Sequence, residues 1–112
     1  MKYKSAIILP LKESFSFTNF GAVSVWVNDY ISNSKISNDL VFCKKLENKQ
    51  RYLSSNVHPI SINKKFFTNS KYIRKISSEL IKKKIDIVEI HNRPEYAFYI
   101  SKNIPNIKVN LV

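Results

Sequence analysis

The sequence predicts an α/β, Rossmann-like domain in which helices flank a mainly parallel sheet of about five strands. Short apolar runs alternate with segments of helical periodicity along the chain, as in successive βαβ units. The runs at residues 6–9 and 85–90 are almost continuously apolar, which is typical of parallel strands buried on both faces. The chain has 112 residues, so residues 1–112 are expected to form a single domain.

The expected strands are apolar runs bounded by polar or turn-forming residues. They lie at residues 3–9, 39–43, 57–62, 85–90 and 107–112. Pro59 has no backbone N–H to donate to a strand ladder, which predicts that the third strand lies at an edge of the sheet. Because βαβ crossovers are right-handed, we expect a doubly wound sheet with strand order 3-2-1-4-5.

Three helices are expected between these strands. The apolar residues of segment 22–31 recur on one helical face. Asn69-Ser70 offers an N-cap for a second helix, whose last turn is rich in lysine, where cations suit the helix dipole. Pro94 suits the first turn of a third helix. The basic segment 71–84 of the second helix is expected to lie on an outer face of the domain.

The charge of the chain leaves several kinds of partner open. The net charge is +11, and 16 of the 19 basic residues are lysine. A strongly basic chain suits an anionic membrane, nucleic acid or a phosphorylated substrate. The scarcity of arginine disfavours nucleic acid, because specific phosphate and base recognition relies on the planar arginine fork. An AT-rich coding sequence produces the same excess of lysine, asparagine and isoleucine without selection for binding.

The remaining composition excludes several classes of site. Cys43 is the only cysteine, and its place at the end of an apolar run predicts a buried, inert thiol in a reducing compartment. Metal-ligand spacing, a Walker A loop and a GxSxG nucleophile elbow are all missing. We therefore expect no metal and no cofactor. No apolar run approaches the ~20 residues of a membrane span and no signal-type segment is present, which favours a cytoplasmic protein.

Gly21 is the first candidate functional residue, because it is the only glycine of the chain. It stands between the loop after the first strand and the first helix, where α/β sheets bind phosphates with exposed backbone N–H groups. Glycine at this point allows the backbone to approach a ligand closely. A plain turn or N-cap glycine explains the same position, so both interpretations stay open.

The second candidate is the segment HNRPEY, which begins at His91 directly after the fourth expected strand. His91 can serve as acid, base or donor, and Asn92 and Arg93 can hold hydroxyls or phosphate. The alternative is a solvated loop in which Asn92 caps the next helix and Glu95 lies near its positive end. Because the first and fourth strands are neighbours in the expected order, we expect Gly21 and His91 to converge on one cleft at the carboxyl edge of the sheet.

These segments resemble a known family of enzymes. NFGAVSVWV, from Asn19, and VEIHNRPEY, from Val88, are similar to the amino-terminal domain of the family-four retaining glycosyltransferases, and the resemblance follows the chain in order. It implies half of a GT-B fold, in which two Rossmann-like domains face each other across a cleft. It also implies that this domain holds the acceptor, whereas a carboxy-terminal domain binds the nucleotide-sugar donor.

The resemblance assigns roles to individual residues. It implies that Gly21 and Ala22 form a loop near the donor diphosphate. It implies that the acceptor side is lined by Asn19, His91, Asn92, Arg93 and Glu95. Two departures from the family stand out in the sequence. Phe20 occupies the first of two positions that are usually both glycine, and the family's histidine after the fifth strand is missing because the chain ends in that expected strand.

We therefore expect a truncated amino-terminal glycosyltransferase domain that lacks the donor-binding domain and is inactive alone. The parent enzyme would transfer a sugar from a nucleotide-sugar to a saccharide or lipid-linked acceptor in envelope polysaccharide or lipopolysaccharide synthesis. It would act in the cytoplasm, with peripheral contact to the anionic inner membrane face. Two alternatives stay open: a small basic binding module for anionic membrane or nucleic acid, and one subunit of a split glycosyltransferase whose carboxy-terminal domain is a separate chain.

Overall fold

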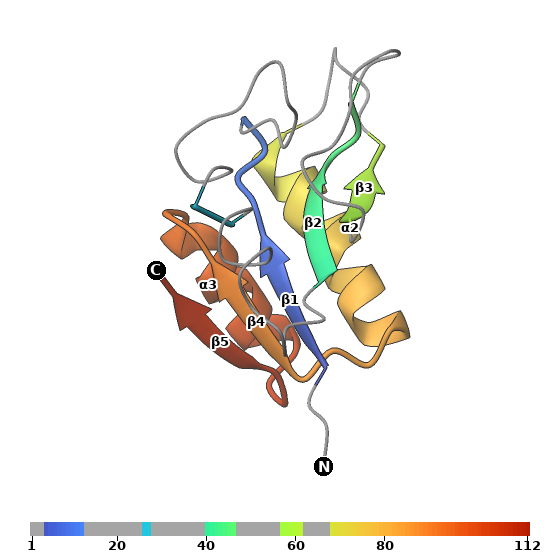
Figure 1. Cartoon of the computed structure of the whole chain (residues 1–112). Coiled ribbons are helices and arrows are strands. Elements are labelled where there is room, and N and C mark those ends of the chain that lie inside the picture. Colours follow the sequence, from blue (N-terminus) through green and yellow to red (C-terminus); the bar gives the residue numbers. More distant parts are fainter. Residues whose placement is uncertain (1–3, 13–25, 28–39, 47–56, 62–67) are drawn as a thin grey trace.

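The structure is a computed structural model that describes residues 4–12, 26–27, 40–46, 57–61 and 68–112. Its centre is a five-stranded sheet with strand order β3-β2-β1-β4-β5 (Figure 1). The strands are β1 (Ser5–Ile8), β2 (Leu40–Lys44), β3 (Val57–Ile60), β4 (Ile87–Ile90) and β5 (Lys108–Leu111), and every neighbouring pair is parallel. The predicted α/β fold class, the parallel sheet and the strand order are confirmed.

The central strand β1 joins the two halves of the sheet. Ile7 pairs with Val41 of β2 on one side and with Glu89 of β4 on the other, so the three central apolar runs share one parallel sheet, as predicted. The first and fourth strands are shorter than predicted, and the residues that precede them, Lys4 and Asp86, are hydrogen-bonded to each other. The backbone N–H of Lys4 donates to the Asp86 carboxylate at 2.9 Å, and the N–H of Asp86 donates to the Lys4 carbonyl at 2.8 Å.

Two helices cover one face of this sheet (Figure 1). They are α2 (Asn69–Lys82), which connects β3 to β4, and α3 (Pro94–Asn103), which connects β4 to β5. Their inward side chains pack with the strand residues that face them into the larger of two cores. The buried members of this core are Ala6, Ile8, Phe42, Ile60, Tyr72, Ile73, Ile76, Leu80, Ile85, Val88, Ile90, Tyr96 and Ile100. Burial of this apolar surface is the main force that holds both helices on the sheet.

The caps of the two helices refine the sequence-based prediction. Helix α2 is capped by Thr68, one residue before the predicted Asn69, because the Thr68 hydroxyl accepts a hydrogen bond from the Lys71 amide at 3.3 Å. Pro94 lies in the first turn of α3, as predicted. Arg93 is the N-cap of α3, and no side chain makes a capping hydrogen bond there.

The opposite face of the sheet carries a second, smaller core. Ile7, Leu9, Val41 and Cys43 are buried there together with Val27. Trp26 and Val27 are helical, in agreement with the predicted helix at residues 22–31, whose other residues lie outside the described part of the chain. The burial predicted for Cys43 is confirmed, and it raises the pKa of the thiol from 9.0 to about 12.

The outward face of α2 is basic. Lys71, Arg74, Lys75 and Lys82 are exposed, which confirms that the basic helix lies on an outer face of the domain. In the part of the chain that the structure describes, no helix has both the length and the apolar character of a membrane span.

Candidate functional site

Two loops leave the carboxyl edge of the sheet next to each other. Ile8 of β1 pairs with Ile90 of β4, so the loop that begins at Leu9 and the loop that begins at His91 start side by side. The order β3-β2-β1-β4-β5 places the topological switch point between β1 and β4. Open α/β sheets bind their ligands in the crevice at this point.

Two buried tyrosines hold the loop after β1 in place. The Tyr72 hydroxyl of α2 donates to the Leu9 carbonyl at 2.8 Å. The backbone N–H of Leu11 donates to the Tyr96 hydroxyl of α3 at 3.2 Å, and the same hydroxyl donates to the side-chain carbonyl of Asn69. Both helices are thereby tied to the edge of the sheet where the two loops meet.

This role of the tyrosines was not expected from the sequence, in which both belong to the apolar stripes of their helices. The presence of tyrosine in an apolar stripe could have predicted these hydrogen bonds, because a buried tyrosine hydroxyl requires a hydrogen-bond partner. Burial raises the pKa of Tyr72 well above 10.0, and burial is also the largest cause of the raised pKa of Tyr96. Both hydroxyls are therefore neutral donors at physiological pH.

His91 is the most unusual polar residue at this edge. Only 5% of its surface is exposed. Val88 and Ile90 of β4 point into the larger core, so the alternation of strand side chains turns Glu89 and His91 toward the opposite face. Among the described residues, His91 Nε2 has no hydrogen-bond partner.

Two side chains flank the His91 imidazole. The Glu89 Oε2 atom lies 3.5 Å from Nε2, close enough for an ion pair when the imidazole is protonated but without hydrogen-bond geometry. On the other side, the Trp26 ring centroid lies 5.0 Å from that of His91, with the ring planes tilted by 53°. Trp26 is 47% exposed, so an aromatic surface, an imidazole and a carboxylate adjoin at the solvent boundary.

The residues that follow His91 are more exposed. Asn92 adopts a positive φ of 54°, and its backbone N–H donates to the Val112 carbonyl at 2.9 Å, which ties the loop to the end of β5. The hypothesis that Asn92 caps α3 is therefore wrong, since Arg93 holds that position. The Arg93 guanidinium lies 3.6 Å from the Glu95 carboxylate, and both side chains reach solvent.

The structure brings together only part of the predicted site. His91, Asn92, Arg93 and Glu95 form one continuous stretch at the carboxyl edge. The other predicted site residues, Asn19, Gly21 and Ala22, lie outside the described residues. The predicted convergence of Gly21 and His91 therefore stays a prediction. Trp26, which belongs to the apolar face of the helix predicted at residues 22–31, contacts His91.

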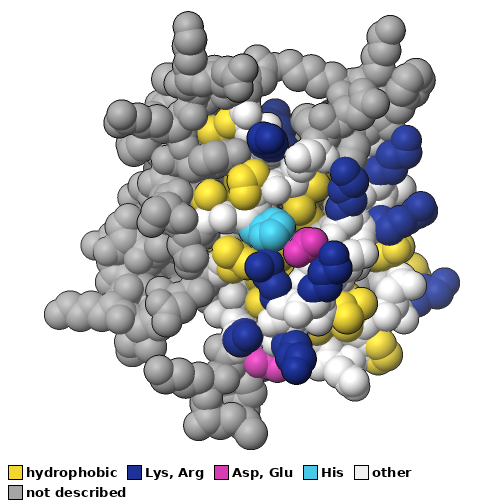
Figure 2. Space-filling view, turned by 90° about the vertical axis from the view of Figure 1, so that its right-hand side faces the viewer, with side chains coloured by type: hydrophobic (Ala, Val, Ile, Leu, Met, Phe, Trp, Pro, Cys, Tyr) yellow, Lys and Arg dark blue, Asp and Glu magenta, His cyan; other side chains and the backbone are white. Residues whose placement is uncertain are grey.

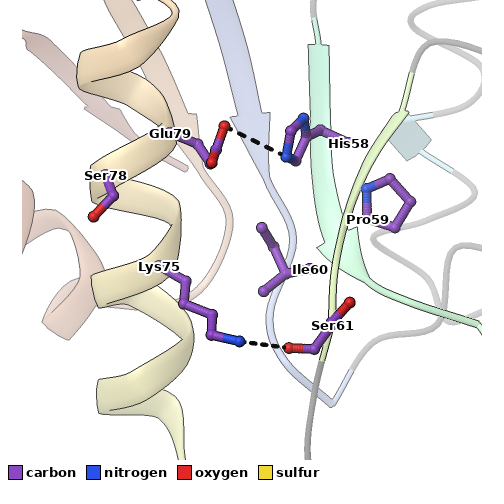
Figure 3. Close-up of a pocket in the computed structure, with 7 residues that line it drawn as sticks. All are labelled: His58, Pro59, Ile60, Ser61, Lys75, Ser78 and Glu79. Carbon is purple, nitrogen blue, oxygen red and sulfur yellow. Dashed lines mark hydrogen bonds and ion pairs between the residues drawn. The ribbon is translucent and has the colours of Figure 1, made fainter.

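A separate groove lies between β3 and α2, away from this edge (Figure 3). Its volume is about 290 Å³, near the lower limit for small-molecule sites. The polar groups in the groove bind one another. His58 Nε2 lies 3.6 Å from the Glu79 carboxylate, and Lys75 Nζ donates to the Ser61 carbonyl at 3.1 Å. Because these partners already satisfy each other, we regard the groove as a weaker candidate than the edge at His91.

The surface around the groove is predominantly basic. Figure 2 looks onto the side of the domain where β3 and α2 lie, and lysine and arginine side chains are spread over it. The acidic residue of α2, Glu79, is shared between His58 and Lys82, whose Nζ lies 3.8 Å away. This face can therefore attract an anionic surface.

Within the described ranges, no three His, Cys, Asp or Glu side chains are grouped closely enough to hold a metal ion. The side chains at the edge near His91 can form hydrogen bonds and aromatic contacts. No protein-family model matches the chain, and no match was found among curated proteins or among solved structures.

Proposed function

We propose that the chain is the acceptor-side domain of a retaining glycosyltransferase of the GT-B type. The parent enzyme would transfer a sugar from a nucleotide-sugar to a saccharide or lipid-linked acceptor in envelope polysaccharide or lipopolysaccharide synthesis. The observation that carries the proposal is the buried His91 imidazole, whose Nε2 has no hydrogen-bond partner among the described residues, at the carboxyl edge of a parallel sheet. A buried polar atom without a partner calls for an explanation, and a ligand hydroxyl at this edge supplies one.

The neighbours of His91 suit a saccharide. Trp26 offers an aromatic surface against which the C–H groups of a sugar ring can lie. The Glu89 carboxylate can accept a hydrogen bond from a sugar hydroxyl, while His91 Nε2 donates or accepts another. Arg93 adds a charge-assisted donor for a phosphate or carboxylate group on the acceptor.

The proposal is tested by titrating the ¹⁵N-labelled chain with mono- and disaccharides, each with and without a phosphate group. Trp26 is the only tryptophan, so its indole N–H signal is assigned without ambiguity. We expect saccharides to shift the signals of Trp26, His91 and Arg93, and phosphorylated saccharides to bind more tightly.

The matched control is Ser78→Ala, which changes a hydroxyl at the groove between β3 and α2 and leaves the edge at His91 intact. It should bind as the unchanged chain does, whereas His91→Ala should lose the shifts. Signal shifts confined to the residues of the α2 surface, or no shifts at the highest sugar concentration used, would contradict the proposal.

The basic face of α2 favours a second candidate function, a binding module for anionic membranes. Lys71, Arg74, Lys75 and Lys82 are exposed along one helix, and Ile81 beside them is 60% exposed. Each basic residue near an anionic bilayer contributes about 1 kcal/mol, and an exposed aliphatic side chain adds apolar contact. Such contact is also compatible with a glycosyltransferase domain at the inner membrane face.

Co-sedimentation with vesicles separates this candidate from the first. We expect binding to phosphatidylserine-containing vesicles that declines as salt is added, and none to neutral phosphatidylcholine vesicles. Arg74→Glu should weaken it, whereas Lys102→Glu on α3 should have a smaller effect. Stronger binding to a single-stranded oligonucleotide than to the anionic vesicles would instead favour nucleic acid.

A further inference from the structure

The two outer strands of the sheet, β3 and β5, differ in how they expose backbone hydrogen-bonding groups. At β3, the Ile60 carbonyl accepts a hydrogen bond from the Lys45 amide, so the backbone polar groups of Ile60 point toward β2. The backbone polar groups of its neighbours Pro59 and Ser61 therefore point outward, away from the sheet. Pro59 has no N–H to offer at that outward position. The outward Ser61 carbonyl already accepts a hydrogen bond from Lys75 Nζ. This edge is therefore protected against pairing with another strand.

Among the described residues, the strand at the opposite edge, β5 (Lys108–Leu111), has no such protection. The amides of Lys108 and Val112 donate to carbonyls on the β4 side, at 2.9 Å and 2.8 Å. The alternation along a strand therefore turns the N–H and C=O groups of Val109 and Leu111 outward. Leu111 is also 50% exposed and Val112 60% exposed. An open strand edge with exposed aliphatic side chains is a template for an added strand.

We propose that β5 pairs antiparallel with β5 of a second copy of this chain. The symmetric register has its two-fold axis at Asn110, so that Val109 of each copy lies opposite Leu111 of the other. This register uses all four outward groups of each copy in inter-chain hydrogen bonds. It joins the two sheets into one continuous ten-stranded sheet, twice the five strands of a single chain.

The side chains fit this register. On one face, Val109 of each copy meets Leu111 of the other, which forms two aliphatic cross-strand pairs. On the other face, Asn110 meets Asn110 of the second copy, and each Lys108 lies opposite a Val112. No two lysines of β5 therefore stand directly opposite each other, although the chain carries a net charge of +11.

Because the edge at β3 is protected and the edge at β5 is not, we expect assembly to stop at two copies. Pairing through β5 leaves only the two β3 edges free, and Pro59 with the Ser61–Lys75 contact blocks both. The contact is isologous, so it closes on itself and does not propagate. The positive charge of each chain opposes the approach of the second. We therefore expect added salt to strengthen the dimer, the opposite of its effect on membrane binding.

Disulfide trapping tests the register directly. Asn110 and its counterpart form a pair without mutual hydrogen bonds, in which Cα atoms are about 4.5 Å apart, within disulfide range. Asn110→Cys should therefore form a covalent dimer under a mild oxidant. The matched control is Lys108→Cys, because the two copies of residue 108 would lie about 13 Å apart. Cys43, the only native cysteine, is buried and should not contribute.

Val109→Pro tests the hydrogen bonds. The Val109 amide faces away from β4, so proline at this position should leave the fold intact while giving β5 the protection that Pro59 gives β3. In sedimentation velocity, we expect the unchanged chain to dimerise with rising concentration and Val109→Pro to weaken the dimer by roughly tenfold or more. Circular dichroism establishes that the variant is folded.

Three results would overturn the proposal. They are a folded 112-residue chain that stays monomeric at the highest concentrations, open-ended polymers in place of dimers, and equal trapping of Asn110→Cys and Lys108→Cys. If Val109→Pro does not fold, Leu111→Lys replaces it, since a lysine beside Val109 of the second copy should also weaken the dimer. A folded Leu111→Lys with unchanged association counts against the β5 contact.

Discussion

The His91 imidazole lies against the Trp26 indole, with 5.0 Å between the ring centroids. Because Trp26 is the only tryptophan, its fluorescence reports on this contact. We expect His91→Ala to shift the Trp26 emission to longer wavelength, since the indole loses a packed ring and gains water. His58→Ala is the matched control, because His58 packs against Phe42. Identical emission of His91→Ala and the unchanged chain would show that the two rings are not in contact.

Tyr72→Phe should destabilise the domain. It removes the hydrogen bond to the buried Leu9 carbonyl, at a cost of about 0.5–1.5 kcal/mol in the free energy of unfolding, and more if that carbonyl finds no water. Tyr99→Phe, on the partly buried side of α3, should cost less. Urea denaturation of the three proteins measures the difference. Equal stability of the two variants would argue against a supporting role for Tyr72.

The burial of Cys43 predicts a loss of stability at alkaline pH. Its pKa is raised from 9.0 to about 12 in the folded chain, so the thiol keeps its proton there while the unfolded chain releases it above 9.0. Stability is therefore complete below pH 9.0 and declines as the pH rises toward 12, by about 1.4 kcal/mol per pH unit.

Urea denaturation between pH 9 and pH 10 measures this slope. The tyrosines of the unfolded chain titrate around 10, so the first half of their ionisation falls in this window and adds to the loss, because Tyr72 and Tyr96 also have raised pKa values. Cys43→Ala should show a smaller slope in this window. The same slope in both proteins would mean that the thiol is not protected by burial.

Arg93→Ala should separate acceptor binding from folding. The Arg93–Glu95 pair reaches solvent, so its loss should change stability by only about 0–1 kcal/mol. Loss of a charge-assisted contact to an anionic acceptor should weaken acceptor binding by roughly tenfold or more. Titration calorimetry with phosphorylated saccharides measures this, with Arg74→Ala on α2 as the control. If Arg93→Ala and Arg74→Ala bind the phosphorylated saccharides with equal affinity, Arg93 does not contact the acceptor.

The isolated chain should not transfer sugar, because the resemblance assigns donor binding to a second domain. When the chain is joined to a donor-binding domain, transfer should appear, and Arg93→Ala should raise the KM for acceptor more than that for the nucleotide-sugar. A coupled assay for nucleotide release measures both. Turnover of a nucleotide-sugar by the 112-residue chain alone would contradict this division of roles.

The sequence by itself determined the elements and their order. The apolar runs around Ile7, Val41 and Val88 predicted buried parallel strands, and right-handed crossovers then left one favoured strand order, which the structure confirms. Pro59 predicted an edge strand, and Cys43 was expected to be buried; both are confirmed. These features depend on the local periodicity of the sequence and on the geometry of the chain, and both are set by residues that are close together in the sequence.

Only the tertiary structure decided which side chains meet. His91 was a candidate by its place after β4, but its burial between Trp26 and Glu89 depends on which face of the sheet it points to and on the placement of Trp26 over that face. The contact between Tyr72 and Leu9 likewise joins residues that the chain path alone does not bring together. Such contacts depend on the relative positions of whole elements, and packing of the complete core sets those positions.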